Sequence, residues 1–373
     1  MSFASRPALT VLQMLPALQA GGVERGTLEI SRFLVEQGHR SLVMSADGRM
    51  VAQLEAEGGE HFNWPIGKKS LLSLRLVKPL RRFFMTQKVD IIHVRSRVPA
   101  WLAWLAWRSM PADNRPRFVT TAHGLYSVSH WSAIMTRGER VIAVSDTVAD
   151  YLRSHYTLDP ARIRVIHRGV DPNSWPHGFQ PGSAWLDHWQ RKYPQLNEQQ
   201  LITLPGRITR WKGQLVFVRL IRQLRDQGLQ VHGLLVGDTD PRKRRFEQEI
   251  RDLIRELDLE AHITLTGHRS DIREIMSVSS LVLSLSLEPE AFGRTVPEAL
   301  ALGRPVAGFA HGGVGEVLQR WYPAGMVKPN NEQDLLRVVG QLLNQPPSIP
   351  VEPLFTLRHM QQATLNIYRE LVP

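Results

Sequence analysis

The chain has 373 residues, of which 43% are hydrophobic and 22% are charged, and it contains no cysteine. This composition is typical of a globular protein with two domains, and it excludes disulfides, thiolate zinc sites and a cysteine nucleophile. The 46 Lys and Arg residues exceed the 35 Asp and Glu residues, which gives a net charge of +11. Such a charge indicates an anionic partner, and nucleic acid, an anionic membrane surface and a phosphorylated substrate are the candidates.

The sequence shows no export signal and no membrane-spanning segment. Residues 1–16 lack the basic start, long apolar stretch and small-residue cleavage site of a signal peptide. The longest wholly apolar run, residues 98–107, is about half of the roughly 20 residues that a membrane-spanning helix needs. We therefore expect a cytoplasmic protein that does not cross a bilayer.

In the first half of the chain, short apolar runs alternate with longer amphipathic stretches such as residues 24–37, which predict helices. The runs predicted to be strands are residues 9–15, 41–45, 89–94, 118–122, 141–145 and 163–167. Strands that alternate with helices build a parallel sheet. This half of the chain is therefore predicted to be an α/β domain.

The pattern fails between residues 169 and 200, where several prolines interrupt it, and this indicates a domain junction. A second series of predicted strands follows at residues 201–204, 231–236, 263–265, 281–285 and 305–309, again with helical patterns between them. A last helical pattern covers residues 356–371, and we expect it to return to the first domain.

The fold class predicted from these patterns is α/β with two domains. We assign residues 1–172, completed by the C-terminal helix within 355–373, to the N-terminal domain. Residues 173–354, which include the junction over 173–200, form the C-terminal domain. Ligands of parallel sheets bind at the carboxyl ends of the strands, so the loops at those ends are the places to look for a site.

In each domain, a glycine-containing turn follows the first predicted strand. The pair Gly21-Gly22 opens a helix, where glycine lets the backbone approach a ligand and helix amides face an anion. In the second domain Gly206 and Arg207 are followed by Lys212, so two cations lie at a strand end that could hold a diphosphate. An ordinary tight turn and solvated surface charges are the alternative interpretations.

The segment 288–316 carries the richest pattern of polar and glycine residues. Glu290 is predicted to lie in a loop, close to Phe292 and Gly293, whereas Glu298 falls in the first turns of a helix. A loop carboxylate and its neighbouring amides can face sugar hydroxyls, and a helical carboxylate can accept hydrogen bonds from ribose hydroxyls. Helix capping is the alternative interpretation for either glutamate.

Taken in order, these motifs resemble those of the retaining GT-B glycosyltransferases of glycosyltransferase family 4, which use nucleotide sugars. The most specific parts are the Glu290-x7-Glu298 spacing and the segment Gly206-Arg-Ile-Thr-Arg-Trp-Lys-Gly213. Supporting matches lie at residues 21–24, 122–124, 144–145 and 169–171. The resemblance covers most of the chain and implies two Rossmann-like domains that face a central cleft, with the acceptor bound by the N-terminal domain and the donor by the C-terminal one.

The resemblance also implies a role for each catalytic candidate. Arg207 and Lys212 would hold the donor diphosphate and neutralise the departing nucleotide, which is electrostatic stabilisation where charge develops. Glu290 would grip the donor sugar, and His123 would lie beside the transferred sugar and the acceptor. We assign no protein general base, because in such enzymes the departing phosphate itself is thought to take the acceptor proton.

Other residues would bind the donor. Glu298 would bind the ribose, the amide of Gly22 would face the phosphates, and amides near Phe292 and Gly293 would face the sugar. The remaining candidates for donor binding are Gly21, Gly206, Gly267, Arg269, Arg294 and Thr295.

No metal or other cofactor is expected. The 14 histidines are scattered without the paired spacing of a zinc site. Asp238-Thr239-Asp240 has the Asp-x-Asp pattern of a metal-binding motif, but it follows a predicted strand directly, so we interpret it as a polar turn. The similar families often carry Asn-Gly where this chain has His167-Arg168-Gly169, and we assign no catalytic role to His167.

Residues 68–88 are rich in Lys, Arg, Leu and Phe and contain no acidic residue. They predict a basic amphipathic surface for anionic lipid, on the cytoplasmic face of the inner membrane. The alternative is a solvated helix face interrupted at Pro79.

The function predicted from the sequence is transfer of a hexose-type sugar, from a nucleotide diphosphate sugar with retention, to a membrane-associated glycan or glycolipid such as the lipopolysaccharide core. UDP is the expected nucleotide. A nucleotide-sugar epimerase of the same fold is the alternative enzyme. A nucleic-acid-binding protein is the alternative of another class, and the absence of an aromatic-interleaved RNA motif or DNA-reading helix speaks against it.

Overall fold

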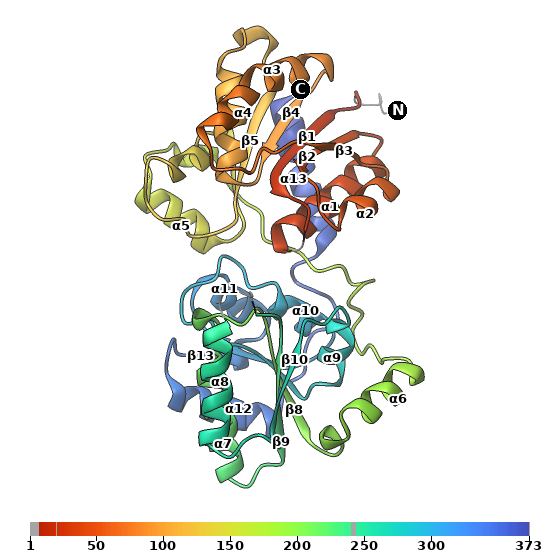
Figure 1. Cartoon of the computed structure of the whole chain (residues 1–373), viewed down its shortest axis with the longest axis vertical. Coiled ribbons are helices and arrows are strands. Elements are labelled where there is room, and N and C mark those ends of the chain that lie inside the picture. The colour runs from red at the N-terminus through yellow and green to blue at the C-terminus, as the bar shows by residue number, and fades with distance from the viewer. Residues whose placement is uncertain (1–6, 20, 240–243, 373) are drawn as a thin grey trace. The chain divides into compact units, whose positions relative to one another are not determined.

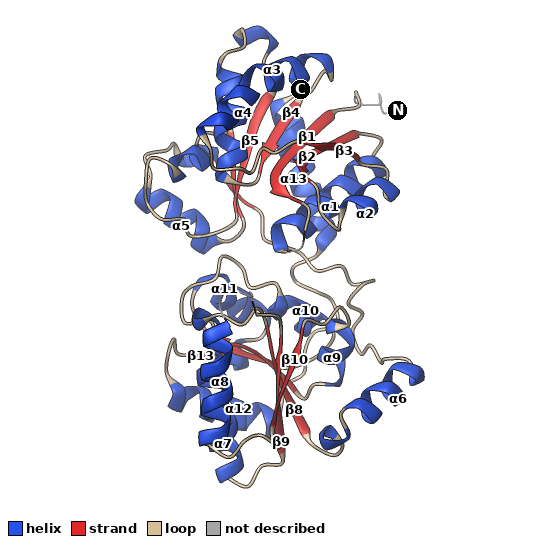
Figure 2. Cartoon of the chain, in the orientation of Figure 1, coloured by secondary structure: helices blue, strands red, loops and turns tan. Residues whose placement is uncertain are grey.

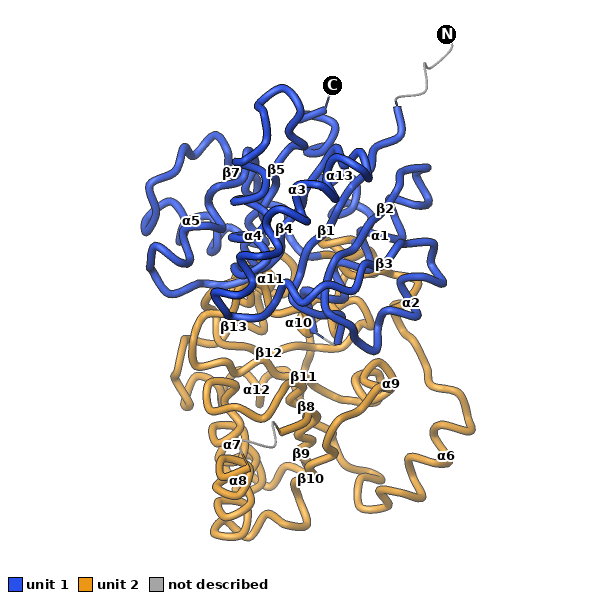
Figure 3. The backbone as a smooth tube through the Cα atoms, turned by 45° about the horizontal axis from the view of Figure 1, so that its top comes forward, with its two compact units in different colours: residues 1–168, 357–373 blue, residues 169–356 orange. Residues whose placement is uncertain are grey.

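The computed structural model describes residues 7–19, 21–239 and 244–372. The chain divides into two compact units, which Figure 3 shows in different colours. Unit 1 comprises Met1–Arg168 and Leu357–Pro373, and unit 2 comprises Gly169–Thr356. The division falls a few residues away from the boundaries expected at 172 and 355. Each unit consists of parallel strands and helices in alternation (Figure 2), as predicted.

Within the described residues, unit 1 has a seven-stranded parallel sheet in the order β3-β2-β1-β4-β5-β6-β7. Its strands are β1 (Thr10–Ala17), β2 (Arg40–Ala46), β3 (Glu60–Asn63), β4 (Ile91–Val94), β5 (Arg117–Ala122), β6 (Arg140–Ala143) and β7 (Ile163–Val165). Its α-helices are α1 (Gly22–Glu36), α2 (Val51–Ala56), α3 (Val77–Thr86), α4 (Arg97–Arg108), α5 (Asp146–His155) and α13 (Leu357–Leu371) (Figure 1). Short 3-10 helices are η1 (Leu71–Leu76), η2 (Ala112–Asn114), η3 (Ser132–Thr136) and η4 (Pro160–Arg162).

Helices cover both faces of this sheet. Val11 and Ile91 pack with α1 and α13 in one core cluster, whereas their chain neighbours Leu12 and Ile92 pack with α3 and α4 in another. Successive side chains of a strand point to opposite faces. Both faces of the sheet are therefore buried. This explains why its strands are continuous apolar runs, without the alternation of apolar and polar residues that a half-exposed sheet shows.

Within the described residues, unit 2 has a six-stranded parallel sheet in the order β10-β9-β8-β11-β12-β13. Its strands are β8 (Gln200–Pro205), β9 (Val231–Val236), β10 (Ile263–Gly267), β11 (Leu281–Ser284), β12 (Val306–Phe309) and β13 (Met326–Val327). Its α-helices are α6 (Ser183–Lys192), α7 (Gln214–Asp226), α8 (Arg244–Glu256), α9 (Ile272–Val278), α10 (Thr295–Ala301), α11 (Gly312–Trp321) and α12 (Glu332–Asn344). Short 3-10 helices are η5 (Pro194–Leu196), η6 (Arg210–Lys212) and η8 (Pro323–Gly325).

Some elements differ from the sequence prediction. The edge strands β3 and β13 were not expected, because short edge strands carry few apolar residues. The junction region contains α6, whose buried Trp189 and partly buried Trp185 pack, with Tyr193 at the end of the helix, against sheet residues such as Leu234. Pro79 does not interrupt a helix, since it lies in the first turn of α3, where proline removes no helical hydrogen bond.

Both sheets reverse their strand order at an inner strand. In unit 1, β2 and β3 lie on one side of β1, and the next strand, β4, lies on its other side. In unit 2, β9 and β10 lie on one side of β8, and the next strand, β11, lies on its other side. In open α/β sheets, the loops that follow two such adjacent strands leave toward opposite faces of the sheet and open a crevice between them. Such switch points are where ligands of open α/β sheets bind.

Candidate donor and acceptor sites

Most candidate residues of unit 2 lie at the switch point of its sheet. Gly206, Arg207 and Lys212 follow β8, and Glu290 lies in the loop that follows β11. Because these strands are parallel neighbours, their carboxyl ends lie at the same edge of the sheet. The fold therefore brings together residues that are 78 positions apart in the sequence.

Lys212 and Glu290 form an ion pair in this crevice. The Lys212 ammonium lies 2.7 Å from Oε1 of Glu290, and both side chains are largely buried, with exposures of 21% and 14%. The Ser286 hydroxyl donates a hydrogen bond to the same carboxylate oxygen. The ammonium also lies 4.4 Å from the centre of the Trp211 ring, a cation–π distance. These contacts fix a cation and a carboxylate next to each other. The cation can donate hydrogen bonds to acceptors of a ligand, and the carboxylate can accept hydrogen bonds from its donors.

The backbone of Glu290 is held from the opposite side by α11. The amide of Gly313 donates to the carbonyl of Glu290 at 2.8 Å, and Glu290 forms a parallel bridge with Gly312. Gly312 has φ +59°, and a Cβ there would stand 2.4 Å from that carbonyl oxygen. His311 donates through Nε2 to the carbonyl of Ser286 at 2.7 Å. These glycines let two chain segments approach closely enough to set the position of the carboxylate.

Arg207 is exposed in the loop between β8 and η6. Its backbone is fixed by Gln214, which is buried (1% exposed) at the start of α7 and donates through Nε2 to the Arg207 carbonyl at 3.0 Å. Ile208 donates to the carbonyl of Asp238 at 3.0 Å. The loop is thus anchored while the guanidinium stays available to an anion. Gln214 was not predicted as a site residue, because a glutamine that opens a helix gives no sequence pattern of its own.

Glu298 is buried in α10, with 6% of its surface exposed. Its carboxylate lies 3.6 Å from Nε of Arg294, one helical turn before it. Thr295 begins the helix, Phe292 packs edge-on against Phe355, and Gly293 has φ +76°, a conformation that favours glycine. The predicted division between a loop carboxylate and a helical one is therefore present in the structure.

Gly267 and Arg269 lie at the end of β10, on the other side of β8. Arg269 is committed to an ion pair with Asp271 at 2.5 Å, and Trp185 of α6 donates to the same carboxylate at 2.7 Å. Burial alone would raise the pKa of Asp271, but these hydrogen bonds hold it below its usual value. Arg269 thus links this loop to α6, both through Asp271 and through the Trp189 ring, which lies 5.5 Å from its guanidinium.

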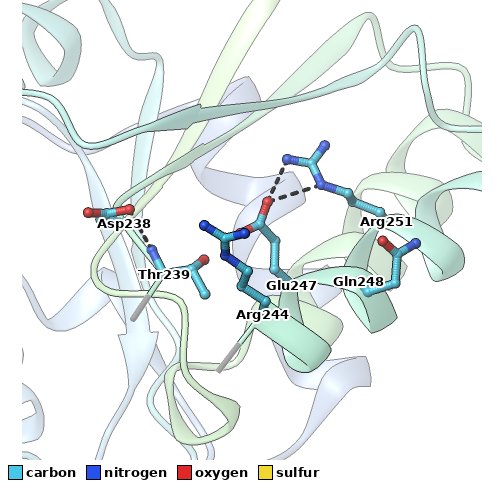
Figure 4. A pocket seen from close by; sticks show the side chains of 6 residues that line it. All are labelled: Asp238, Thr239, Arg244, Glu247, Gln248 and Arg251. Atoms are coloured by element: carbon cyan, nitrogen blue, oxygen red, sulfur yellow. Dashed lines mark hydrogen bonds and ion pairs between the residues drawn. The ribbon is translucent and has the colours of Figure 1, made fainter. Parts of the chain in front are cut away.

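Asp238 follows β9 and accepts a hydrogen bond from the amide of Thr239 at 2.8 Å, which is the geometry of a polar turn. Together with Arg244, Glu247, Gln248 and Arg251 these residues line a hollow of about 450 Å³, shown in Figure 4. Glu247 is paired with Arg251 at 2.6 Å. Asp240, the second carboxylate of the Asp-x-Asp pattern, lies outside the described residues.

In unit 1, Gly21 and Gly22 follow β1, and His123 follows β5. Gly21 precedes α1 without a side-chain cap, and both glycines are exposed, so the first amides of the helix face solvent. An anion can bind such amides. The amide of His123 donates to the Tyr126 hydroxyl at 3.1 Å, which fixes the turn that carries the imidazole.

The His123 side chain contacts Arg168, which follows β7. The Nη2 atom of Arg168 lies 2.6 Å from Nδ1 of His123. Burial, together with the positive charges of Arg168 and Arg95 and the nearby His93, holds the pKa of His123 well below its usual value of 6.5. Arg168 was not predicted as a site residue, and its signal in the sequence was the replacement of the usual Asn-Gly by Arg168-Gly169.

Two protein-family models match the chain in succession. Residues 20–174 match Glycosyltransferase Family 4, and residues 187–352 match Glycosyl transferases group 1. The two matches coincide with most of unit 1 and most of unit 2.

Solved structures with the same fold cover nearly the whole chain. A glycosyltransferase from Rickettsia africae is 30% identical, with a TM-score of 0.86 over 98% of this chain and 99% of that one. HepE of Anabaena, solved in complex with UDP and glucose, is 20% identical, with a TM-score of 0.81 over 97% of this chain and 100% of that one. The second likeness shows the fold alone.

Among curated relatives, D-inositol 3-phosphate glycosyltransferase of Mycobacteroides abscessus is 26% identical over 212 residues, which are 56% of this chain and 45% of that protein. The matched stretch thus spans about half the length of this relative. The family models match both units, and a glycosyltransferase that is 30% identical matches over almost the full length of both chains. The chain therefore belongs to the GT-B glycosyltransferases of family 4.

Proposed function

We propose that the protein transfers a sugar from a nucleoside diphosphate sugar to an acceptor, with retention of configuration. The observation that supports this most directly is the meeting of Lys212, Glu290 and the Arg207 loop at the switch point of unit 2. A diphosphate needs cations, and a sugar needs a hydroxyl acceptor beside them. This crevice offers both within one hydrogen-bonded group.

The proposed roles follow from the charge of each group. Arg207 and Lys212 bind the diphosphate, because fixed cations stabilise the negative charge that grows on the leaving phosphate. Glu290 accepts hydrogen bonds from sugar hydroxyls, assisted by the amides of Phe292 and Gly293. Glu298 accepts hydrogen bonds from the ribose, next to Arg294.

During transfer, the bond between the anomeric carbon and the phosphate oxygen breaks, and a bond from that carbon to the acceptor oxygen forms. The acceptor proton passes to the departing phosphate, so no protein base is required. Lys212 remains near both groups, because its pairing with Glu290 already holds it where the sugar and the phosphate meet. Unit 1 supplies two further groups. The amides of Gly21 and Gly22 bind the phosphates, and the imidazole of His123 binds beside the transferred sugar and the acceptor.

We propose UDP as the nucleotide, since the fold is shared with a HepE structure that contains UDP and glucose. For the sugar we propose a hexose. We also propose that no metal takes part, because the cations of Arg207 and Lys212 suffice to neutralise the phosphates.

We propose a membrane-associated glycan or glycolipid as the acceptor, and the lipopolysaccharide core is one acceptor of this kind. In the part of the chain that the structure describes, no helix is long and apolar enough to cross a membrane. The 3-10 helix η1 presents exposed Leu71, Leu72 and Leu74, with exposures of 86%, 64% and 50%, and basic residues of η1 and α3 follow them in the chain. Apolar side chains that stand beside Lys and Arg suit peripheral binding to the anionic lipid of the cytoplasmic leaflet.

A binding panel tests the donor assignment. UDP, GDP, ADP, CMP and their common sugars are compared by thermal shift and calorimetry on the wild type, on Arg207→Ala and on the control Arg222→Ala, whose guanidinium pairs with Asp226. We expect UDP to stabilise the wild type and the control but not Arg207→Ala, and EDTA to leave this unchanged. If none of the nucleotides binds, the donor site is wrong, and oligonucleotides become the next ligands to test.

A further inference from the structure

Arg168 is a buried cation at the carboxyl edge of the unit 1 sheet. Only 7% of its surface is exposed, and its Nη1 atom lies against α1, where a Cβ on Gly26 would stand 2.9 Å from it. The same Nη1 contacts the sulfur of Met360 in α13 at 3.5 Å. Packing by two helices thus leaves the guanidinium little freedom, and its other terminal nitrogen, Nη2, lies against the ring of His123.

The chemistry of the two groups decides the protonation of that ring. A guanidinium is always protonated and can only donate. The 2.6 Å contact between Nη2 and Nδ1 of His123 therefore requires a lone pair on Nδ1. The distance from Nη2 to Nε2 is 3.4 Å, which is longer than a normal hydrogen bond. A neutral imidazole with its proton on Nε2 is the form that fits.

The surroundings favour the same neutral form. Arg95 lies at the end of β4, is 2% exposed, and donates from Nε and Nη2 to the Oε1 atom of Gln13 at 3.0 and 2.6 Å. His93 is buried in β4 between the hydroxyls of Tyr368 and Thr121, at 2.6 Å from each.

The remaining neighbour lies in the turn that carries His123 itself. The Tyr126 hydroxyl accepts from the His123 amide, and burial raises the pKa of this phenol. The Arg97 guanidinium lies 5.1 Å from the centre of the Tyr126 ring. The groups that face His123 are therefore cations and neutral rings, and a second positive charge on the imidazole would be repelled.

We propose that Arg168 is a positioning residue for sugar transfer, which holds His123 neutral and protonated on Nε2, so that Nε2–H is the hydrogen-bond donor offered to the transferred sugar. This rests on the proposed function, which places His123 beside that sugar. The benefit is electrostatic. The anomeric centre becomes positively charged as its bond to the leaving phosphate breaks, and an imidazolium beside it would oppose that charge, whereas a neutral N–H donor does not.

The protonation state is measured without any turnover. Full-length protein with 15N-labelled histidine gives long-range proton–nitrogen NMR spectra, and the His123 signals are assigned by their loss in His123→Asn. In the wild type we expect the Nε2–H tautomer and no protonation until well below pH 6.5. In Arg168→Gln we expect a mixture of tautomers and titration nearer the usual pKa of about 6.5.

Kinetics show whether Arg168 acts through His123. We expect Arg168→Gln to lower kcat on the order of 10- to 100-fold, the range seen when an outer partner of a functional imidazole is removed from a metal site. The loss should deepen as the pH falls through about 6.5. In a His123→Ala background, Arg168→Gln should add little, because the two changes remove the same interaction.

The inference is overturned if the wild-type ring carries its proton on Nδ1, or if its tautomer and pKa are the same in Arg168→Gln. The wild-type tautomer decides by itself should Arg168→Gln fail to fold, and Arg168→Lys, which keeps a cation, serves as the conservative variant and should keep His123 neutral. A normal rate for His123→Ala would instead contradict the proposed place of His123 beside the sugar, and the NMR result would still decide the action of Arg168.

Discussion

At the scale of single residues, the site depends on charges that are fixed before any ligand binds. Lys212 and Glu290 are held by each other, by Ser286 and by the Trp211 ring. Fixed charges need little reorganisation during the reaction, and this is the main source of electrostatic catalysis. The same principle applies to His123, whose neutral state is favoured first by burial and then by the neighbouring cations Arg168 and Arg95.

Loss of Lys212 should show this directly. We expect Lys212→Ala to lower kcat by roughly 100- to 1000-fold, the usual cost of removing one prearranged donor, while the thermal unfolding temperature stays near that of the wild type. The measurement is nucleotide release from the donor that the binding panel identifies. The matched control is Arg210→Ala, in the same 3-10 turn, whose guanidinium pairs with Glu249 at the surface. Near-normal turnover of Lys212→Ala would contradict its role.

At the scale of elements, close approach of backbone segments shapes the crevice. The turn from β8 to α7 passes through Gly213, which has φ +76°, and a Cβ there would stand 2.1 Å from the carbonyl oxygen of Leu285. The loops after β8 and β11 could not pack in this way with any larger residue. Glycine at this position is thus needed both for the turn and for the contact.

A pair of alanine variants separates these two effects. Gly228 has φ +84° with open space around the position of a Cβ, so Gly228→Ala should cost only the conformational strain of about 1–2 kcal/mol. Gly213→Ala carries the same strain and also the clash with Leu285, so its loss of stability should be clearly larger. Urea unfolding of both variants measures the difference. Equal losses would show that the two loops can move apart freely.

The exposed leucines of η1 lead to a second prediction at this scale. We expect the wild type to sediment with vesicles that contain phosphatidylglycerol and less with purely zwitterionic ones, and added salt should weaken the binding. Leu71→Ser with Leu72→Ser should reduce binding at least about 10-fold, because each leucine contributes roughly 1.5–3 kcal/mol when buried.

The control for this experiment changes comparable side chains in unit 2. Val351→Ser with Leu354→Ser removes residues that are 66% and 53% exposed, and it should bind vesicles as the wild type does. Equal binding by the η1 variant and the wild type would exclude η1 as the docking element.

At the scale of the whole molecule, the last helix of the chain completes the first unit. Tyr368 in α13 contacts His93 across 275 residues of sequence. The apolar side chains that α13 buries in unit 1 are Leu357, Met360, Leu365, Ile367, Tyr368 and Leu371. Burial of each contributes roughly 1.5–3 kcal/mol, and their sum is comparable to the whole stability of a typical domain, about 5–15 kcal/mol.

Truncation after Thr356 should therefore unfold unit 1 and spare unit 2. Calorimetry should show the loss of one transition, while UDP still raises the melting temperature of the other. Asn366→Ala, an exposed position on α13, should leave both transitions unchanged. Intact melting of unit 1 in the truncated protein would show that α13 is dispensable for its core.

The sequence alone determined the class of fold and most of the candidate site. Its continuous apolar runs and amphipathic stretches are local patterns, and the buried parallel strands β1 and β9 and the helix α1 follow from them. The glycines and cations near residues 206–213 and the carboxylates Glu290 and Glu298 were also visible, because each motif sits within a short stretch of chain.

Only the tertiary structure decided which of these residues meet. The ion pair of Lys212 and Glu290 depends on β11 lying beside β8, and the contact of Arg168 with His123 depends on two strands and two helices that pack around one guanidinium. The same holds for Arg269, whose charge is taken up by Asp271 under α6. Such partners are chosen by the order of strands and by packing between distant segments, and no local pattern in the sequence encodes either.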